Sequence, residues 1–228
     1  MSKQIKYSST RGGETSLSYE DVLLSGLARD GGLFMPEEWP HFSYSELENM
    51  KSLDYAELAT KIMYPFIEPC LSEKEVFKIC KDTYSGFNED IAPLRNLKNN
   101  TYILELFHGP TFAFKDYAMQ FLSRAFNQAL TKRNKRGVIL GATSGDTGSA
   151  ALEAFKGQEN IDIFILFPHQ RVSEVQQKQM TYINDPGAYA LSVKTDFDGC
   201  QSIVKDCFED LNFKDQTSLS AINSINWV

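Results

Sequence analysis

Apolar and polar residues follow different patterns in the two parts of the chain. Up to about residue 95, apolar residues recur mostly at helical spacing, between turn signals such as Asp30-Gly31-Gly32. Two serine-led capping patterns, which begin at Ser18 and Ser72, predict helix starts because each has an acidic residue three positions later. We therefore expect a helical or mixed N-terminal region over 1–95. Its expected helices lie near 18–27, over about 53–66 and from 72 onwards.

From residue 96 onwards, near-continuous apolar runs alternate with segments of helical periodicity. Apolar runs separated by helices are typical of parallel strands that are covered on both faces. We therefore predict an α/β fold, with an open parallel sheet and flanking helices, over 96–228. The expected strands are 101–106, 137–142, 161–167 and 189–193, and the expected helices are 116–133, 147–156, 173–183 and 199–211.

Composition and charge narrow the possible functions. The 228 residues carry a net charge of -7, with a sequence pI near 5.1, and the basic residues are scattered, so we expect no nucleic acid or anionic membrane as a partner. The sequence has neither a membrane-spanning apolar run nor a signal peptide, which favours a cytoplasmic protein. The four cysteines form no C-x-x-C pair and there are three histidines, so we expect no metal site.

The segment FHGPTFAFKDY, residues 107–117, places one lysine, Lys115, among aromatic residues. An ammonium group there loses hydration, and Asp116 is its only evident partner. Desolvation favours the neutral amine, which is the nucleophile of Schiff-base chemistry. The alternative is a surface lysine whose alkyl chain covers apolar neighbours while the amine reaches water. His108 is either an acid or base in the reaction or a hydrogen-bonded loop residue.

The segment GATSGDTGSAA, residues 141–151, joins an expected strand to an expected helix. Glycines that allow a close backbone approach, side-chain hydroxyls and the unpaired N–H groups of a helix N-terminus form an anion-binding loop, which would suit a carboxylate or a phosphate. The residues of this loop are Thr143, Ser144, Gly145, Thr147 and Gly148. Asp146 must have another task, because it repels anions. The alternative is a glycine-rich turn with only a structural role.

Three similar motifs can be excluded for this loop. A Walker A motif needs a lysine after its last glycine, and the glycines have the wrong spacing for G-x-G-x-x-G. The pattern G-x-S-x-G is also absent. Because the lysine segment and the loop each follow an expected strand, both are predicted to open on the same edge of one sheet. A nucleophilic lysine beside a carboxylate-binding loop is what a pyridoxal-phosphate enzyme acting on an amino acid requires.

Five separated motifs together resemble the threonine synthase family, in the same order along nearly the whole chain. They are YSSTRGG (7–13), LARDGGLFMPE (27–37), LELFHGPTFAFKDYAMQF (104–121), GATSGDTGSAA (141–151) and NSIN (223–226). The resemblance implies a fold-type-II pyridoxal-phosphate enzyme that converts O-phospho-L-homoserine and water to L-threonine and phosphate.

The resemblance also implies roles for individual residues. Lys115 would hold the cofactor as an internal aldimine and then shuttle protons at the substrate carbons. The loop 143–148 would receive the substrate carboxylate, with Asp146 beside the ring oxygen of the cofactor. Asn223 and Ser224 would lie near the substrate phosphate. Many fold-type-II enzymes carry asparagine where this chain has Asp146, which leaves the hydrogen-bond arrangement there open.

The chain departs from the family pattern at its end. Family members continue for a comparable length beyond NSIN, and that part contains the glycine-rich loop for the cofactor phosphate and the partner of the pyridine nitrogen. A basic residue expected just after Trp227 is also missing, because Val228 is the last residue. We therefore expect the 228-residue chain alone to bind the cofactor poorly and to turn over little substrate. The sequence does not indicate an oligomeric state.

Two other functions stay open at this point. One is a related phospholyase that eliminates phosphate from an amino-alcohol phosphate. The other is a non-catalytic fragment that serves as an interaction module, which would present an exposed apolar face.

Overall fold

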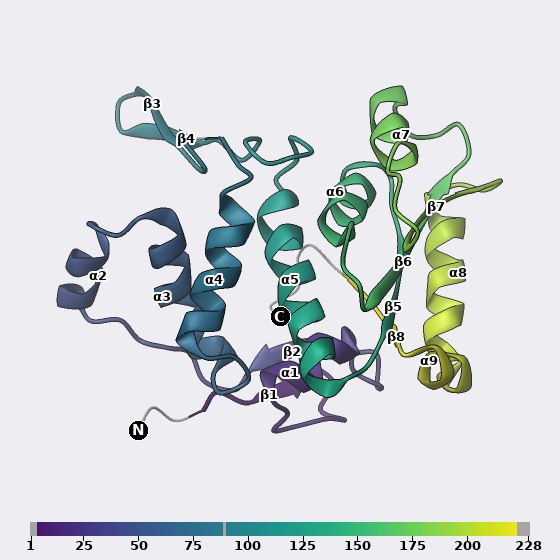
Figure 1. Ribbon diagram of the computed structural model, residues 1–228, viewed down its shortest axis with the longest axis horizontal. Coiled ribbons are helices and arrows are strands. Elements are labelled where there is room, and N and C mark those ends of the chain that lie inside the picture. Colours follow the sequence, from purple (N-terminus) through teal and green to yellow (C-terminus); the bar gives the residue numbers. More distant parts are fainter. Residues whose placement is uncertain (1–3, 89, 223–228) are drawn as a thin grey trace. The chain divides into compact units, whose positions relative to one another are not determined.

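The computed structural model describes residues 4–88 and 90–222, which divide into two compact units (Figure 1). The first unit contains residues 4–84, and the second begins at Ser85. Within the described residues, no helix is long and apolar enough to cross a membrane. The division into domains at residues 95 and 96 stays a prediction.

The first unit is mainly helical, as predicted. Its elements are β1 (Tyr7–Ser9), α1 (Tyr19–Ser25), β2 (Phe34–Pro36), α2 (Tyr44–Met50), α3 (Tyr55–Ile67) and α4 (Glu73–Tyr84). Strands β1 and β2 pair antiparallel, and the Tyr7 hydroxyl donates to the Phe66 carbonyl at 2.8 Å, which ties β1 to the end of α3. The three predicted helices are confirmed. Both serine caps are also confirmed, because Ser18 and Ser72 accept bonds from the backbone N–H three residues later.

Helix α2 was not predicted. Ser43 and Glu46 form a reciprocal capping box at its start, but none of its residues is buried. A short exposed helix has little apolar periodicity, because no face of it needs to be covered. Local capping therefore forms α2 without the signal on which the other helices were predicted.

The second unit contains a four-stranded parallel sheet between helices. Its elements are β3 (Leu94–Lys98), β4 (Thr101–Leu104), α5 (Asp116–Arg133), β5 (Gly137–Ala142), α6 (Asp146–Phe155), β6 (Ile161–Pro168), α7 (Glu174–Thr181), β7 (Ala188–Val193), α8 (Phe197–Glu209), α9 (Leu211–Thr217) and β8 (Leu219–Ser220). The sheet order is β7-β6-β5-β8, with all pairs parallel. The predicted α/β fold is confirmed.

Helices cover both faces of this sheet. Helix α6 lies on one face and α8 on the other, and α5 packs beside α6 (Figure 1). Ile139 of β5 and Ile163 and Ile165 of β6 are at most 2 % exposed, so the two central strands form the core of the unit. Because all four strands are parallel, their carboxyl ends meet at one edge, where the loops after β5 and β6 are neighbours.

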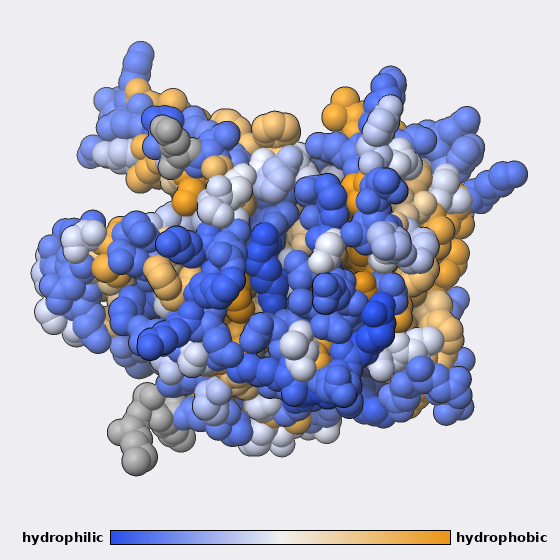
Figure 2. All heavy atoms as spheres, viewed as in Figure 1, coloured by the Kyte–Doolittle hydropathy of each residue, from blue (hydrophilic) through white to orange (hydrophobic). Residues whose placement is uncertain are grey.

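The prediction for strand 101–106 was wrong in one respect. A strand forms there, but β4 pairs antiparallel with β3 in a separate two-stranded hairpin, and every residue of both strands is exposed. Its large apolar side chains at the surface are Leu94, Leu97, Tyr102, Ile103 and Leu104. Figure 2 shows hydrophobic and hydrophilic residues mixed over this hairpin. The apolar run therefore predicted that a strand forms, but it did not predict that this strand pairs with β3 outside the parallel sheet.

Candidate active site

Lys115 lies at the start of α5, where it occupies the N-cap position with helical backbone angles (φ -60, ψ -27). Its side chain is 15 % exposed, and Nζ lies 3.8 Å from the centroid of the Phe114 ring. The Phe114 ring therefore covers part of the amine, and the side chain as a whole keeps a small exposed fraction. Lys115 therefore lies at a helix start, and most of its side chain is covered.

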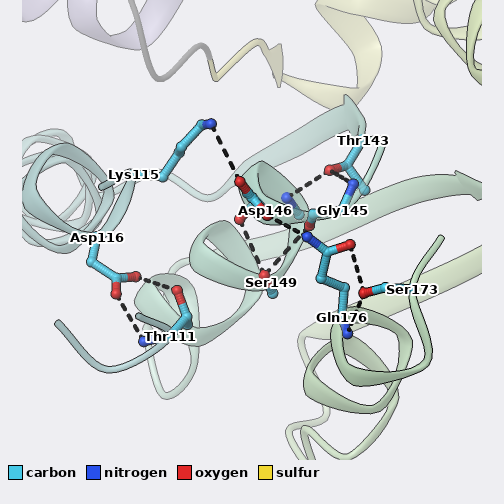
Figure 3. A network of polar contacts seen from close by, with 10 residues as sticks. Thr111, Lys115, Asp116, Thr143, Gly145, Asp146, Ser149, Ser173 and Gln176 are labelled. Carbon is cyan, nitrogen blue, oxygen red and sulfur yellow. Dashed lines mark hydrogen bonds and ion pairs between the residues drawn. The ribbon is translucent and has the colours of Figure 1, made fainter. Parts of the chain in front are cut away.

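Asp116 is not the partner of Lys115, which corrects the expectation from the sequence. Its carboxylate turns away and accepts bonds from the backbone N–H of Thr111 at 2.8 Å and from the Thr111 hydroxyl at 2.7 Å (Figure 3). Asp116 is fully buried, and burial raises its pKa, although the bonds from Thr111 oppose that shift. A Cβ on Gly109 would come 2.5 Å from the Asp116 Cβ, so only glycine fits there.

The predicted anion-binding loop is organised around Thr143. The Thr143 hydroxyl oxygen accepts bonds from the N–H groups of Gly145 and Gly148, both at 2.9 Å, and the residue is 2 % exposed. Gly145 has φ +148, which a residue with a side chain rarely adopts. A Cβ on Gly148 would come 2.4 Å from the Thr143 methyl group. Thr143 therefore shapes the loop from inside, and a contact between it and a substrate stays a prediction.

The outer side of the loop has backbone donors available. Among the residues that the structure describes, none accepts a hydrogen bond from the N–H groups of Ser144, Asp146 or Thr147. Ser144 is exposed and Thr147 is partly exposed. Unpaired N–H groups at the start of α6 favour a negatively charged group beside them. This geometry would suit an anion, and the binding of a substrate carboxylate by the loop stays a prediction.

Lys115 and Asp146 face each other across the site. The Lys115 Nζ lies 3.8 Å from Asp146 Oδ2, and Figure 3 shows the two side chains pointing toward one another from α5 and α6. This approach results from the packing of α5 beside α6, since β4, the strand before Lys115, is outside the parallel sheet. The predicted meeting of lysine and loop is thus observed, but through helix packing and not through neighbouring strands.

Gln176, which was not predicted as a site residue, contacts the same carboxylate. Its Nε2 donates to Asp146 Oδ1, and its Oε1 accepts a bond from the Ser173 hydroxyl at 2.9 Å (Figure 3). Ser173 also caps α7. The spacing of Ser173 and Gln176 is a capping pattern, so the sequence signals a helix start there but gives no sign of the contact with Asp146.

The remaining predicted residues are placed as follows. His108 is hydrogen-bonded, with Nε2 3.0 Å from Glu105 Oε2, which agrees with the loop-residue alternative. Asn223 and Ser224 lie outside the described residues. Over the described ranges, no three His, Cys, Asp or Glu side chains are grouped to hold a metal ion.

Comparisons with known proteins agree on one family. The family model described as "Threonine synthase N terminus" matches residues 6–84. The threonine synthase of Pseudomonas aeruginosa is 50% identical over 98% of this chain and 48% of its own length, and that of Schizosaccharomyces pombe is 44% identical over 100% and 46%. The structure of a PLP-bound threonine synthase from Brucella melitensis superimposes with a TM-score of 0.91, at 48% identity, over 98% of this chain and 48% of that one.

The coverage of these matches is uneven. Almost all of this chain is matched, but the chain spans about half the length of the relatives. In sequence and in fold, it is similar to about half of each of those proteins, and its residues 6–84 match a family model of the N terminus.

Proposed function

We propose that this chain, which corresponds to the N-terminal half of the threonine synthase family, supplies the catalytic lysine and the carboxylate-binding loop of a threonine synthase. The complete protein would convert O-phospho-L-homoserine and water to L-threonine and phosphate in the cytoplasm. The observation that carries the proposal is the Lys115 amine, on a side chain that is 15 % exposed, 3.8 Å from Asp146 and beside a loop whose outward N–H groups have no acceptor among the described residues.

The residues present fit pyridoxal phosphate. Lys115 offers a primary amine on a side chain that is 15 % exposed, and this is the group that would hold the cofactor covalently. Asp146 would lie beside the ring oxygen. When bound, the cofactor supplies an electron sink for the negative charge that develops on the substrate carbons.

The chain's own residues would then bind substrate and move protons. The N–H groups and hydroxyls around Ser144 and Thr147 would hold the substrate carboxylate, with the internal bonds of Thr143 fixing the shape of the loop. The Lys115 amine would take and return protons at the substrate carbons, because it is the basic group that faces the loop, with Nζ 3.8 Å from Asp146 Oδ2. By the resemblance, Asn223 and Ser224 would lie near the substrate phosphate.

A product assay tests this function. The protein expressed from its complete gene, incubated with pyridoxal phosphate and O-phospho-L-homoserine, is expected to release phosphate and L-threonine in equal amounts. Lys115→Ala is expected to reduce both by at least about a thousandfold, because it removes the amine. Phosphate release without threonine would contradict the assignment and support the related phospholyase. Product formation unchanged in Lys115→Ala would contradict the proposed role of the lysine.

The 228-residue chain gives a second comparison. We expect it to form little or no product under the same conditions, because the resemblance implies further cofactor contacts in the other half of the relatives' length. Full activity of this chain would contradict that expectation and show that the described site is sufficient for the reaction. The reading frame after codon 228 shows directly which chain the gene encodes.

A further inference from the structure

Helix α7 contacts both halves of the candidate site through two glutamines on one of its faces. Gln176 Nε2 donates to the Asp146 carboxylate, and Gln179 Nε2 donates to the Thr111 carbonyl at 3.2 Å. Residues three apart lie on the same side of a helix. Thr111 belongs to the loop that leads to Lys115, so one helix face bonds to the segment of each charged residue.

Helix α7 is itself held firmly against the loop after β5. Met180 is 2 % exposed, and a Cβ on Gly148 would come 2.9 Å from its sulfur. Gln176 lies so close over the loop that a Cβ on Gly145 would come 2.2 Å from its Oε1. Glycine at 145 is therefore needed for the glutamine to reach Asp146, as well as for the backbone angle.

The Asp146 carboxylate needs such a support. Its side chain is 49 % exposed, and an ion pair at 3.8 Å with Lys115 is too weak and too dependent on salt to fix one rotamer of an exposed carboxylate. A hydrogen bond from a neutral amide orients the carboxylate without neutralising it. The Ser173 hydroxyl in turn orients the amide, because it donates to Oε1 and so leaves Nε2 directed toward Asp146.

We propose that Gln176 is a positioning residue that holds the Asp146 carboxylate toward Lys115. The effect of this positioning on turnover rests on the proposed function. The contact between Gln176 and Asp146 does not depend on that function. Gln176 acts through Asp146 and is not expected to touch the reacting atoms. Gln179 holds α7 against the loop that leads to Lys115, so that Gln176 and Lys115 keep their relative positions.

The first test is a double-mutant cycle on turnover in the protein expressed from its complete gene. Gln176→Ala is expected to lower kcat roughly tenfold, with KM changed by less than about twofold, because a misplaced group affects the reaction more than binding. In an Asp146→Ala background, Gln176→Ala is expected to have no further effect on kcat. Equal losses in both backgrounds would overturn the proposal, since Gln176 would then act without Asp146.

Two variants separate the hydrogen bond from the volume of the side chain. Gln176→Glu keeps the shape but cannot donate to a carboxylate when it is ionised, so it is expected to lose at least as much kcat as Gln176→Ala. Gln177→Ala is the matched control, because Gln177 is an exposed amide on the same helix and no side-chain bond from it is seen within the described residues. Wild-type kcat in Gln176→Glu would overturn the proposal, and wild-type kcat in Gln177→Ala supports it.

The second test does not depend on activity. The same cycle is measured on the thermal unfolding midpoint, where Gln176→Ala is expected to lower the midpoint by about 2 °C in the wild-type background and by nothing measurable in Asp146→Ala. Additive shifts would overturn the positioning role. If the wild type forms no product, the proposed function fails, and this cycle still decides whether Gln176 holds Asp146.

Discussion

The two loops of the candidate site are built in the same way from different chemistry. In each, an inward-facing polar side chain accepts bonds from its own loop, and a charged side chain nearby faces the site. Asp116 accepts two bonds from Thr111 beside Lys115, and Thr143 accepts two N–H bonds beside Asp146. The anchor of the lysine loop is a carboxylate, and the anchor of the other loop is a hydroxyl.

The difference between the anchors has physical consequences. A hydroxyl satisfies two donors without carrying a charge into the interior. A buried carboxylate makes stronger bonds but loses its hydration, which is why burial raises the pKa of Asp116. The contribution of the lysine loop to the free energy of unfolding should therefore depend on pH, and removal of its anchor should cost more stability. The contribution of the Thr143 loop should not depend on pH in the same range.

The largest expected effect is the removal of the charged anchor. Asp116→Ala is expected to lower the free energy of unfolding by about 2–3 kcal/mol, because the N–H and hydroxyl of Thr111 lose a carboxylate acceptor in a covered site. Chemical denaturation monitored by circular dichroism measures the loss. A loss as small as that of an exposed substitution would contradict the role of Asp116 as an anchor. Asp116→Asn, which keeps an acceptor oxygen, is the matched control and is expected to lose less.

Removal of the neutral anchor should have a smaller effect. Thr143→Val keeps the shape of the side chain but has no acceptor for Gly145 and Gly148, so a loss of about 1–2 kcal/mol is expected in the same measurement. Thr143→Ser keeps the hydroxyl and should therefore retain most of the stability that Thr143→Val loses. If Thr143→Ser were as unstable as Thr143→Val, the methyl packing and not the hydroxyl would hold the loop.

The smallest expected effect is a dependence on pH that separates the two loops. Because the folded pKa of Asp116 is raised, the folded protein keeps a proton that the unfolded chain releases near the ordinary value of 3.8. The stability from this proton is complete below that value and is lost as pH rises through the raised pKa. The stability of the wild type relative to Asp116→Asn is therefore expected to fall as pH rises from about 4 toward neutrality.

Denaturation curves of both proteins across this pH range check that slope. A difference between wild type and Asp116→Asn that stays constant, or that grows in favour of the wild type, would contradict the burial argument. Thr143→Ser provides the comparison with the other loop, because its difference from the wild type should not change over this range.

Much of the second unit could be predicted because its local patterns and its tertiary packing agree. The bounds of α5 and β5 match the prediction, since their apolar residues face the core that the periodicity implies. Strand β4 shows where this reasoning stops. Its apolar run looks like that of β5, but an antiparallel hairpin with β3 uses the same residues at the surface, and the choice of partner depends on long-range contacts that a local pattern does not encode.

The site could be predicted as far as its residue types. A lysine among aromatics and a glycine-rich loop are visible in the sequence, but the actual neighbours are set by the fold. Adjacency in sequence suggested Asp116 as the partner of Lys115, whereas consecutive side chains at a helix start point in different directions. Gln176 is 30 positions from Asp146, so only the packing of α7 beside α6 brings them together.

Chemical trapping tests the central claim, that Lys115 is the amine of this site, most directly. The protein expressed from its complete gene is incubated with pyridoxal phosphate, reduced with borohydride, and digested for peptide mass mapping. We predict that the cofactor is attached at Lys115 at about one per chain, and that Lys115→Ala abolishes this attachment without increasing it elsewhere. Attachment spread over exposed lysines, with Lys115 unmodified, would contradict the account.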